Sequence, residues 1–80
     1  MYWIYAISSS KKKRIYVGMS QDVDKRVREH NLGQVFSTKG YRPWRLIYSE
    51  KCGINRKEAR AREKYFKSGI GKEFLKNIPG

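Results

Sequence analysis

The sequence predicts an α+β fold: a small three-stranded antiparallel sheet flanked by helices, in the order β-β-α-β-α-α. Runs of aromatic and β-branched residues, interrupted by turn residues, are typical of strands. Two later segments repeat apolar residues at helical spacing and have capping residues at their ends. A length of 80 residues suits one domain, spanning residues 1–80, whose small core must be packed efficiently.

Three segments are expected to form the strands. Residues 1–7 and 15–18 would make a hairpin, joined by serines and the basic run of residues 11–14. Residues 34–43 contain Ser-Thr-Lys-Gly and Arg-Pro sequences, which are typical of a loop. Residues 44–49 then form the third predicted strand. The tip of the hairpin is either a solvated turn or a contact for phosphate groups.

Capping residues define the predicted helices. Ser20 is a suitable N-cap for a helix that runs to about Asn31 and stops at Gly33. Asn55, followed by a glutamate three residues later, resembles a capping box that opens a helix reaching about Lys67. Two glycines are expected to break that helix, before a short closing helix over residues 72–77 ends ahead of a proline.

Charge is the strongest indication of a partner. Nineteen Lys and Arg residues against seven Asp and Glu give a formal net charge of +12. A field of this size favours a polyanionic partner, and nucleic acid is the leading candidate. The basic residues are spread along the chain, which is unlike a helix that binds a membrane surface.

The sequence also indicates a cytoplasmic location without membrane contact. The longest apolar or aromatic run, residues 2–7, is far shorter than a membrane span. Basic residues follow that run, which is the wrong order for a secretory signal. The single cysteine, Cys52, allows no internal disulfide and has no Cys or His neighbour at metal-ligand spacing. No small-molecule cofactor is expected.

Two reactive side chains fall on the apolar stripe of the first predicted helix. Helical geometry places Val23, Val27 and His30 on one stripe, with Arg26 at its edge. This stripe should face the sheet, so the histidine and the arginine point toward the interior or its mouth. The structural alternative is a satisfied, half-buried histidine beside an arginine that extends to solvent.

A carboxylate interrupts the apolar face of the second predicted helix. Ala59, Glu63 and Phe66 share that face by the same geometry. A buried, unpaired carboxylate is strongly unfavourable, so Glu63 requires a cation, a metal or hydrogen-bond donors. An ion pair with Arg60 or Arg62 would satisfy it equally well.

Tyr5 and Tyr16 belong to the two strands of the predicted hairpin and can face each other across it. Tyrosine is common in strands, so ordinary sheet packing is the alternative explanation. The two tyrosines therefore gain significance only from their combination with the helical residues.

Taken together, these segments resemble the GIY-YIG nucleases, which include intron homing endonucleases and the incision subunit of bacterial nucleotide excision repair. The name-giving pair matches Trp3-Ile4-Tyr5 and Tyr16-Val17-Gly18. Further matches, in family order, lie at residues 25–31, 36–39, 42–44, 58–63 and 67–69. The sequence departs from the family pattern at Trp3, at Val17, and at Met19, where some members carry a lysine.

The resemblance implies an active site and a metal. Its catalytic residues would be Tyr5, Tyr16, Arg26, His30 and Glu63. Glu63 would hold one divalent ion, Mg²⁺ or Mn²⁺, with water and phosphate oxygens completing the shell. The residues expected to hold the DNA backbone without reading its sequence are Arg14, Gly18, Lys39, Arg42 and Arg45.

The implied function is that of a metal-dependent endonuclease acting on duplex or branched DNA, in repair or recombination. A catalytically silent basic module that only binds nucleic acid is the main alternative. A protein-interaction domain anchored by Trp3, Tyr41 and Trp44 is a third hypothesis, which the net charge disfavours. The sequence leaves open which tyrosine is the base and how many copies associate.

Overall fold

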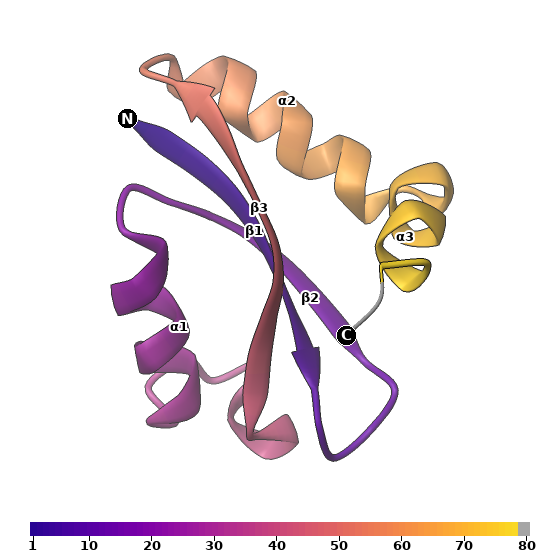
Figure 1. The fold of residues 1–80 in the computed structure, drawn as a ribbon. Helices are drawn as coiled ribbons and strands as arrows, with labels where there is room; N and C mark the ends of the chain where they lie inside the picture. The colour runs from indigo at the N-terminus through magenta and orange to yellow at the C-terminus, as the bar shows by residue number, and fades with distance from the viewer. Residues whose placement is uncertain (79–80) are drawn as a thin grey trace.

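The central strand of the sheet is the first in the chain, and both later strands pair with it in antiparallel fashion, in the order β2-β1-β3. The computed structural model describes residues 1–78. Helix α1 covers one face of the sheet and helices α2 and α3 cover the other (Figure 1). The elements are β1 (Tyr2–Ser9), β2 (Ile15–Ser20), α1 (Val23–Asn31), β3 (Trp44–Gly53), α2 (Arg56–Lys67) and α3 (Gly69–Lys76). The predicted α+β fold and its element order are confirmed.

Two small cores lie on opposite faces of the sheet, because successive side chains of a strand point to opposite sides. Under α2 and α3 the buried residues are Ile4, Ala6, Val17, Phe66 and Leu75. Under α1 they are Tyr5, Ile7 and Trp44, with Val23 and Val27 of α1 packed against them. Strand β1 contributes to both cores, and four consecutive residues of it are buried. Within residues 1–78, no helix has the length and apolar character to cross a membrane.

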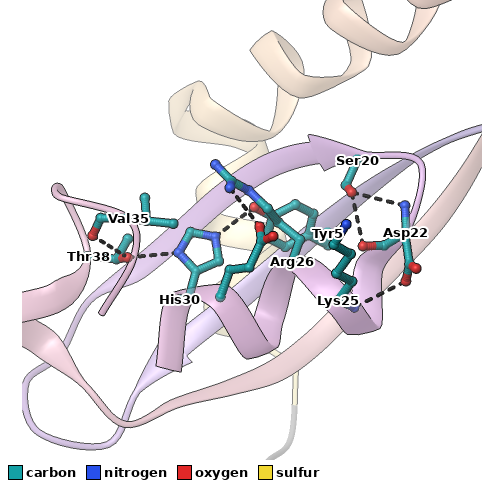
Figure 2. Close-up of polar contacts among 9 residues, drawn as sticks. Tyr5, Ser20, Asp22, Lys25, Arg26, His30, Val35 and Thr38 are labelled. Carbon is teal, nitrogen blue, oxygen red and sulfur yellow. Dashed lines mark hydrogen bonds and ion pairs between the residues drawn. The ribbon is translucent and has the colours of Figure 1, made fainter. Parts of the chain in front are cut away.

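The first helix begins later than predicted. Ser20 is the last residue of β2, and its hydroxyl accepts a hydrogen bond from the Asp22 backbone N–H (Figure 2). Asp22 is the true N-cap, since its carboxylate accepts from the backbone N–H of Lys25. The prediction of Ser20 as N-cap was wrong because both residues are good caps and the strand extends through the serine. The predicted end is confirmed, with Gly33 at φ 80°.

Two other boundaries differ from the predictions. Strand β3 continues to Gly53, because β1 starts at Tyr2 and offers backbone partners along this whole length. The closing helix α3 begins at Gly69, since the Ser68 hydroxyl caps it by accepting from the Gly71 N–H. The predicted loop of residues 34–43 contains a short 3₁₀ turn at Lys39–Tyr41. Pro79, expected to follow α3, lies outside the described residues.

The junction of α2 and α3 depends on a glycine. A methyl group at Gly71 would overlap the Tyr65 carbonyl oxygen and the Phe66 Cα. Neither backbone atom can move without separating the two helices, so the close approach requires glycine. At Gly69, in the same helix, a methyl group would meet nothing within 4 Å.

We therefore expect Gly71→Ala to lower the free energy of unfolding by about 1–3 kcal/mol, the usual cost of overpacking. Thermal or urea unfolding measures the loss. The matched control Gly69→Ala should leave stability unchanged or raise it slightly, because alanine favours the helix. Equal stabilities for the two variants would contradict this account of the α2–α3 junction.

Candidate active site

A fully buried histidine lies at the centre of the polar residues on the α1 side of the sheet. His30 has no exposed surface, and each ring nitrogen has a partner. Its Nδ1 lies 2.7 Å from the Thr38 hydroxyl and its Nε2 lies 2.8 Å from the Tyr5 hydroxyl (Figure 2). The Thr38 hydroxyl donates its only proton to the Val35 carbonyl, so it accepts from Nδ1–H. In the neutral ring Nε2 is then unprotonated and accepts a hydrogen bond from Tyr5.

Strand pairing places Tyr5 in this network. Tyr5 pairs with Gly18 of β2, and its ring lies across the glycine. A Cβ atom at Gly18 would come within 2.5 Å of the Tyr5 hydroxyl oxygen. The glycine is therefore needed to seat the tyrosine against His30, whereas the predicted contact of Gly18 with DNA stays a prediction.

The two tyrosines face each other across the hairpin as predicted, as diagonal neighbours on one face of the sheet. The hairpin closes where the Ser9 N–H donates to the Arg14 carbonyl, and this register pairs Tyr16 with Ile7. The Tyr5 and Tyr16 ring centroids are 6.4 Å apart, and the Tyr16 and His30 ring centroids are 5.0 Å apart in an edge-to-face arrangement. Tyr16 is half-buried, which makes it the more accessible of the two.

The loop that carries Thr38 is anchored at both ends. Asn31, at the end of α1, accepts from the Trp44 backbone N–H at 2.6 Å and donates to the Trp44 carbonyl at 3.0 Å. The Trp44 indole N–H donates to the Thr38 carbonyl at 2.9 Å. Sequence reasoning assigned no role to Asn31 or Thr38, because they lie at a helix end and in a loop, where periodicity says nothing about side chains.

Arg26 lies beside the Tyr5 hydroxyl, one helical turn before His30 (Figure 2). Its guanidinium pairs with Glu29 at 3.0 Å, and 39% of its side chain is exposed. Burial raises the pKa of Tyr5 to about 12, and the nearby Tyr16 and Glu63 add to the rise while Arg26 opposes it. Tyr5 therefore keeps its proton near neutral pH.

The same surroundings keep the histidine neutral. Burial lowers the pKa of His30 below its ordinary 6.5, the positive charge of Arg26 lowers it further, and Glu29 opposes the change. Near pH 7 the ring is then uncharged, and Nε2 can accept a proton. A protonated phenol next to an unprotonated imidazole nitrogen forms a short pathway for proton transfer.

Glu63 lies on α2, which covers the other face of the sheet, near enough for its charge to act on Tyr5, and only 7% of its surface is exposed. The alternative of an ion pair is borne out for Arg60, whose guanidinium lies 3.3 Å from Glu63. Lys67 pairs with the second carboxylate oxygen at 3.2 Å. The predicted partner Arg62 was wrong, because it turns to Glu50 at 2.6 Å. Buried Glu63 thus shares the predicted apolar face with Ala59 and Phe66.

The single carboxylate of Glu63 suits one hard cation better than a site closed by several protein ligands. Within residues 1–78, no three His, Cys, Asp or Glu side chains gather closely enough to hold a metal ion between them. Mg²⁺ is commonly bound through one or two carboxylates together with water and substrate phosphates. Glu63 offers one such carboxylate, and its partners Arg60 and Lys67 are half-exposed, so both can swing away from it.

The predicted DNA-contacting residues separate into two places. Lys39 and Arg42 line a groove of about 530 Å³ beside the end of α1, together with Lys11 and Asn31. Arg14 and Arg45 line a second groove of about 850 Å³ next to α3. The structure therefore divides these four residues between two grooves, although the Arg14 guanidinium lies over the Tyr41 ring of the loop.

Comparison with known proteins matches this arrangement to one family. The model of the GIY-YIG catalytic domain matches residues 1–76. A UPF0213 protein of Haloquadratum walsbyi is 37% identical over 68 residues, which cover 84% of this chain and 74% of the relative. GIY-YIG domains are nuclease domains that act on DNA and generally depend on a divalent metal. With its sheet, its two tyrosines and its helical histidine and glutamate in family order, this chain belongs to the GIY-YIG family.

Proposed function

We propose that this protein is a metal-dependent DNA endonuclease that hydrolyses phosphodiester bonds with Tyr5, Tyr16, Arg26, His30 and Glu63. The observation that carries the proposal is the buried hydrogen-bonded chain Tyr5–His30–Thr38 with Arg26 beside it. Family membership supports nuclease chemistry, and the network supplies a route for the proton that hydrolysis releases.

Tyr5 and His30 act together as the base. A water oxygen attacks phosphorus and gives one proton to the Tyr5 oxygen, while the Tyr5 proton moves to His30 Nε2. With a pKa of about 12, Tyr5 alone would not be ionised near neutrality. The adjacent neutral imidazole removes that difficulty, since the phenol accepts one proton as it loses another. The bond to the leaving oxygen breaks, and that oxygen takes a proton from solvent.

The remaining residues position the phosphate. Arg26, part exposed beside Tyr5, donates charge-assisted hydrogen bonds to the phosphoryl oxygens as their negative charge grows. Tyr16, half-buried and in edge-to-face contact with the His30 ring, orients the water or the phosphate. Glu63 would hold the divalent ion, which supplies charge stabilisation at the phosphoryl group when bound.

The DNA backbone is held by the basic loop groove. Lys11, Lys39 and Arg42 line it close to the end of α1, which carries His30. Contacts of this kind attract any sequence, so they position DNA without specifying a target. The resemblance to excision-repair and homing endonucleases supports action on duplex or branched DNA in repair or recombination.

Replacing the metal-binding carboxylate provides the first test. Glu63→Gln should abolish nicking of supercoiled plasmid in Mg²⁺, with the thermal melt nearly unchanged because glutamine keeps the size of the side chain and an oxygen that accepts from Arg60 and Lys67. Glu58→Gln, an exposed change on the same helix, should cut DNA at the rate of the parent. A chelator should abolish cleavage by the parent and by this control variant. Equal cutting by the Glu63 variant and the parent would overturn the assignment.

Arg26→Ala should lower the single-turnover cleavage rate by about 10²–10³, as expected for loss of one preorganised donor. Binding should weaken much less, because many other cations supply the ground-state attraction. The matched control is Arg28→Ala, on an exposed position of the same helix. If both variants lose affinity equally and neither loses rate, Arg26 only holds phosphate. Equal thermal unfolding curves for the parent and both variants would exclude misfolding as the cause.

The rate should rise with pH and level off, with a midpoint below 6.5, because the active His30 is unprotonated and its pKa is lowered. Single-turnover assays across this range measure the profile. Thr38→Val should lower the plateau, since it leaves the buried Nδ1–H without an acceptor, whereas Thr38→Ser keeps the hydroxyl and the rate. A rate that falls as pH rises toward neutrality would show that the imidazolium is the active form.

A further inference from the structure

A second basic groove lies on the sheet face opposite to Tyr5 and His30. Its volume is about 850 Å³, and it lies between the hairpin end of the sheet and α3. Five basic residues line it: Lys13, Arg14, Arg45, Lys72 and Lys76. None of the described residues that line this α3 groove is acidic. Such a concentration of one charge favours a ligand with several negative charges.

The floor of the α3 groove is aliphatic. Its apolar lining consists of Ile15, Ile47, Leu75 and Ile78. All four belong to the core under α2 and α3, whereas Tyr5 belongs to the core under α1. A positively charged groove can follow the backbone of a single strand. Its aliphatic floor offers apolar contact to bases, which are uncovered in a single strand and hidden by stacking in a duplex.

The basic run at the hairpin tip joins the two grooves. Lys11 lines the loop groove, whereas Lys13 and Arg14 line the α3 groove. Arg14 lies over the Tyr41 ring at 4.7 Å, and Lys12 lies 5.8 Å from the same ring. Consecutive basic residues of one short turn therefore line different grooves, and the charged group of Arg14 lies over Tyr41.

A single linear duplex would have to bend around the hairpin tip to follow both grooves. They lie on different faces of a molecule whose shortest extent is 19 Å. Duplex DNA is stiff over about 150 base pairs, so it does not wrap smoothly around a body of this size. Two nucleic-acid segments that diverge near the hairpin tip would occupy both grooves without such bending.

We propose that the α3 groove binds a single-stranded DNA segment of the substrate while duplex DNA occupies the loop groove and the active site. This inference rests on the proposed function and specifies its substrate as DNA with a single-stranded branch. The basic hairpin tip would lie where the strand leaves the duplex. Lys72 and Lys76, exposed on one helix, are the contacts most suited to a test.

The experiment measures binding in chelator, where cleavage does not interfere, with three probes: linear duplex, the same duplex with a single-stranded flap, and the same flap without bases. The double variant Lys72→Ala/Lys76→Ala should weaken flap binding and leave linear-duplex binding nearly unchanged. The slope of log affinity against log salt for flap DNA should become shallower by about 1.4, or about 0.7 for each lost phosphate contact on a single strand.

The matched control is Lys57→Ala/Lys64→Ala, which removes two exposed lysines of α2 outside both grooves. Lys13→Ala tests the opposite wall of the α3 groove independently of α3 folding. Three results would each overturn the proposal. The control pair could lose as much affinity for flap DNA as the Lys72/Lys76 variant, or that variant could lose as much affinity for linear duplex as for flap DNA. The parent could also bind the flap without bases as tightly as the normal flap. Parent cleavage of linear duplex is assayed separately, so failure of the nuclease assignment is distinguishable from failure of the groove.

Discussion

The buried hydrogen bonds of His30 constrain most of the structure around the site. Its ring has no contact with solvent, so both nitrogens must find partners within the protein, or the fold would bear an unsatisfied polar group. Tyr5 satisfies one nitrogen and Thr38 the other. Each partner brings its own requirement. Tyr5 requires a glycine opposite it on β2, and Thr38 requires a loop fixed by Asn31 and Trp44.

Charge is arranged around this network so that each group stays in a useful protonation state. Burial keeps the proton on Tyr5 and keeps His30 uncharged, and Arg26 favours the neutral imidazole still further. Glu63 is paired with two half-exposed cations, Arg60 and Lys67, so its carboxylate becomes accessible once they move away. His30 has a fixed tautomer next to the protonated phenol of Tyr5. The buried carboxylate of Glu63 has flexible ion-pair partners. Both properties suit hydrolysis more than simple packing.

Much of this arrangement could be predicted from the sequence, and the exceptions have identifiable causes. The stripe of Val23, Val27 and His30 followed from helical geometry, as did the burial of Glu63 between Ala59 and Phe66. The register that makes Tyr5 and Tyr16 diagonal neighbours did not, because it depends on where the hairpin closes. Thr38 escaped prediction because its role is set by a loop path that Trp44 and Asn31 determine from distant positions. The division of the basic residues between two grooves likewise required the sheet faces to be known.

The central claim is that His30 is held neutral, with its proton on Nδ1, so that Nε2 can receive the Tyr5 proton. Because the chain contains one histidine, nitrogen-15 NMR of untagged protein reports this ring without any assignment problem. Long-range proton–nitrogen correlations at neutral pH should show a protonated Nδ1 and an unprotonated Nε2, with titration below pH 6.5. A spectrum with the proton on Nε2, or a doubly protonated ring at neutral pH, would contradict the account.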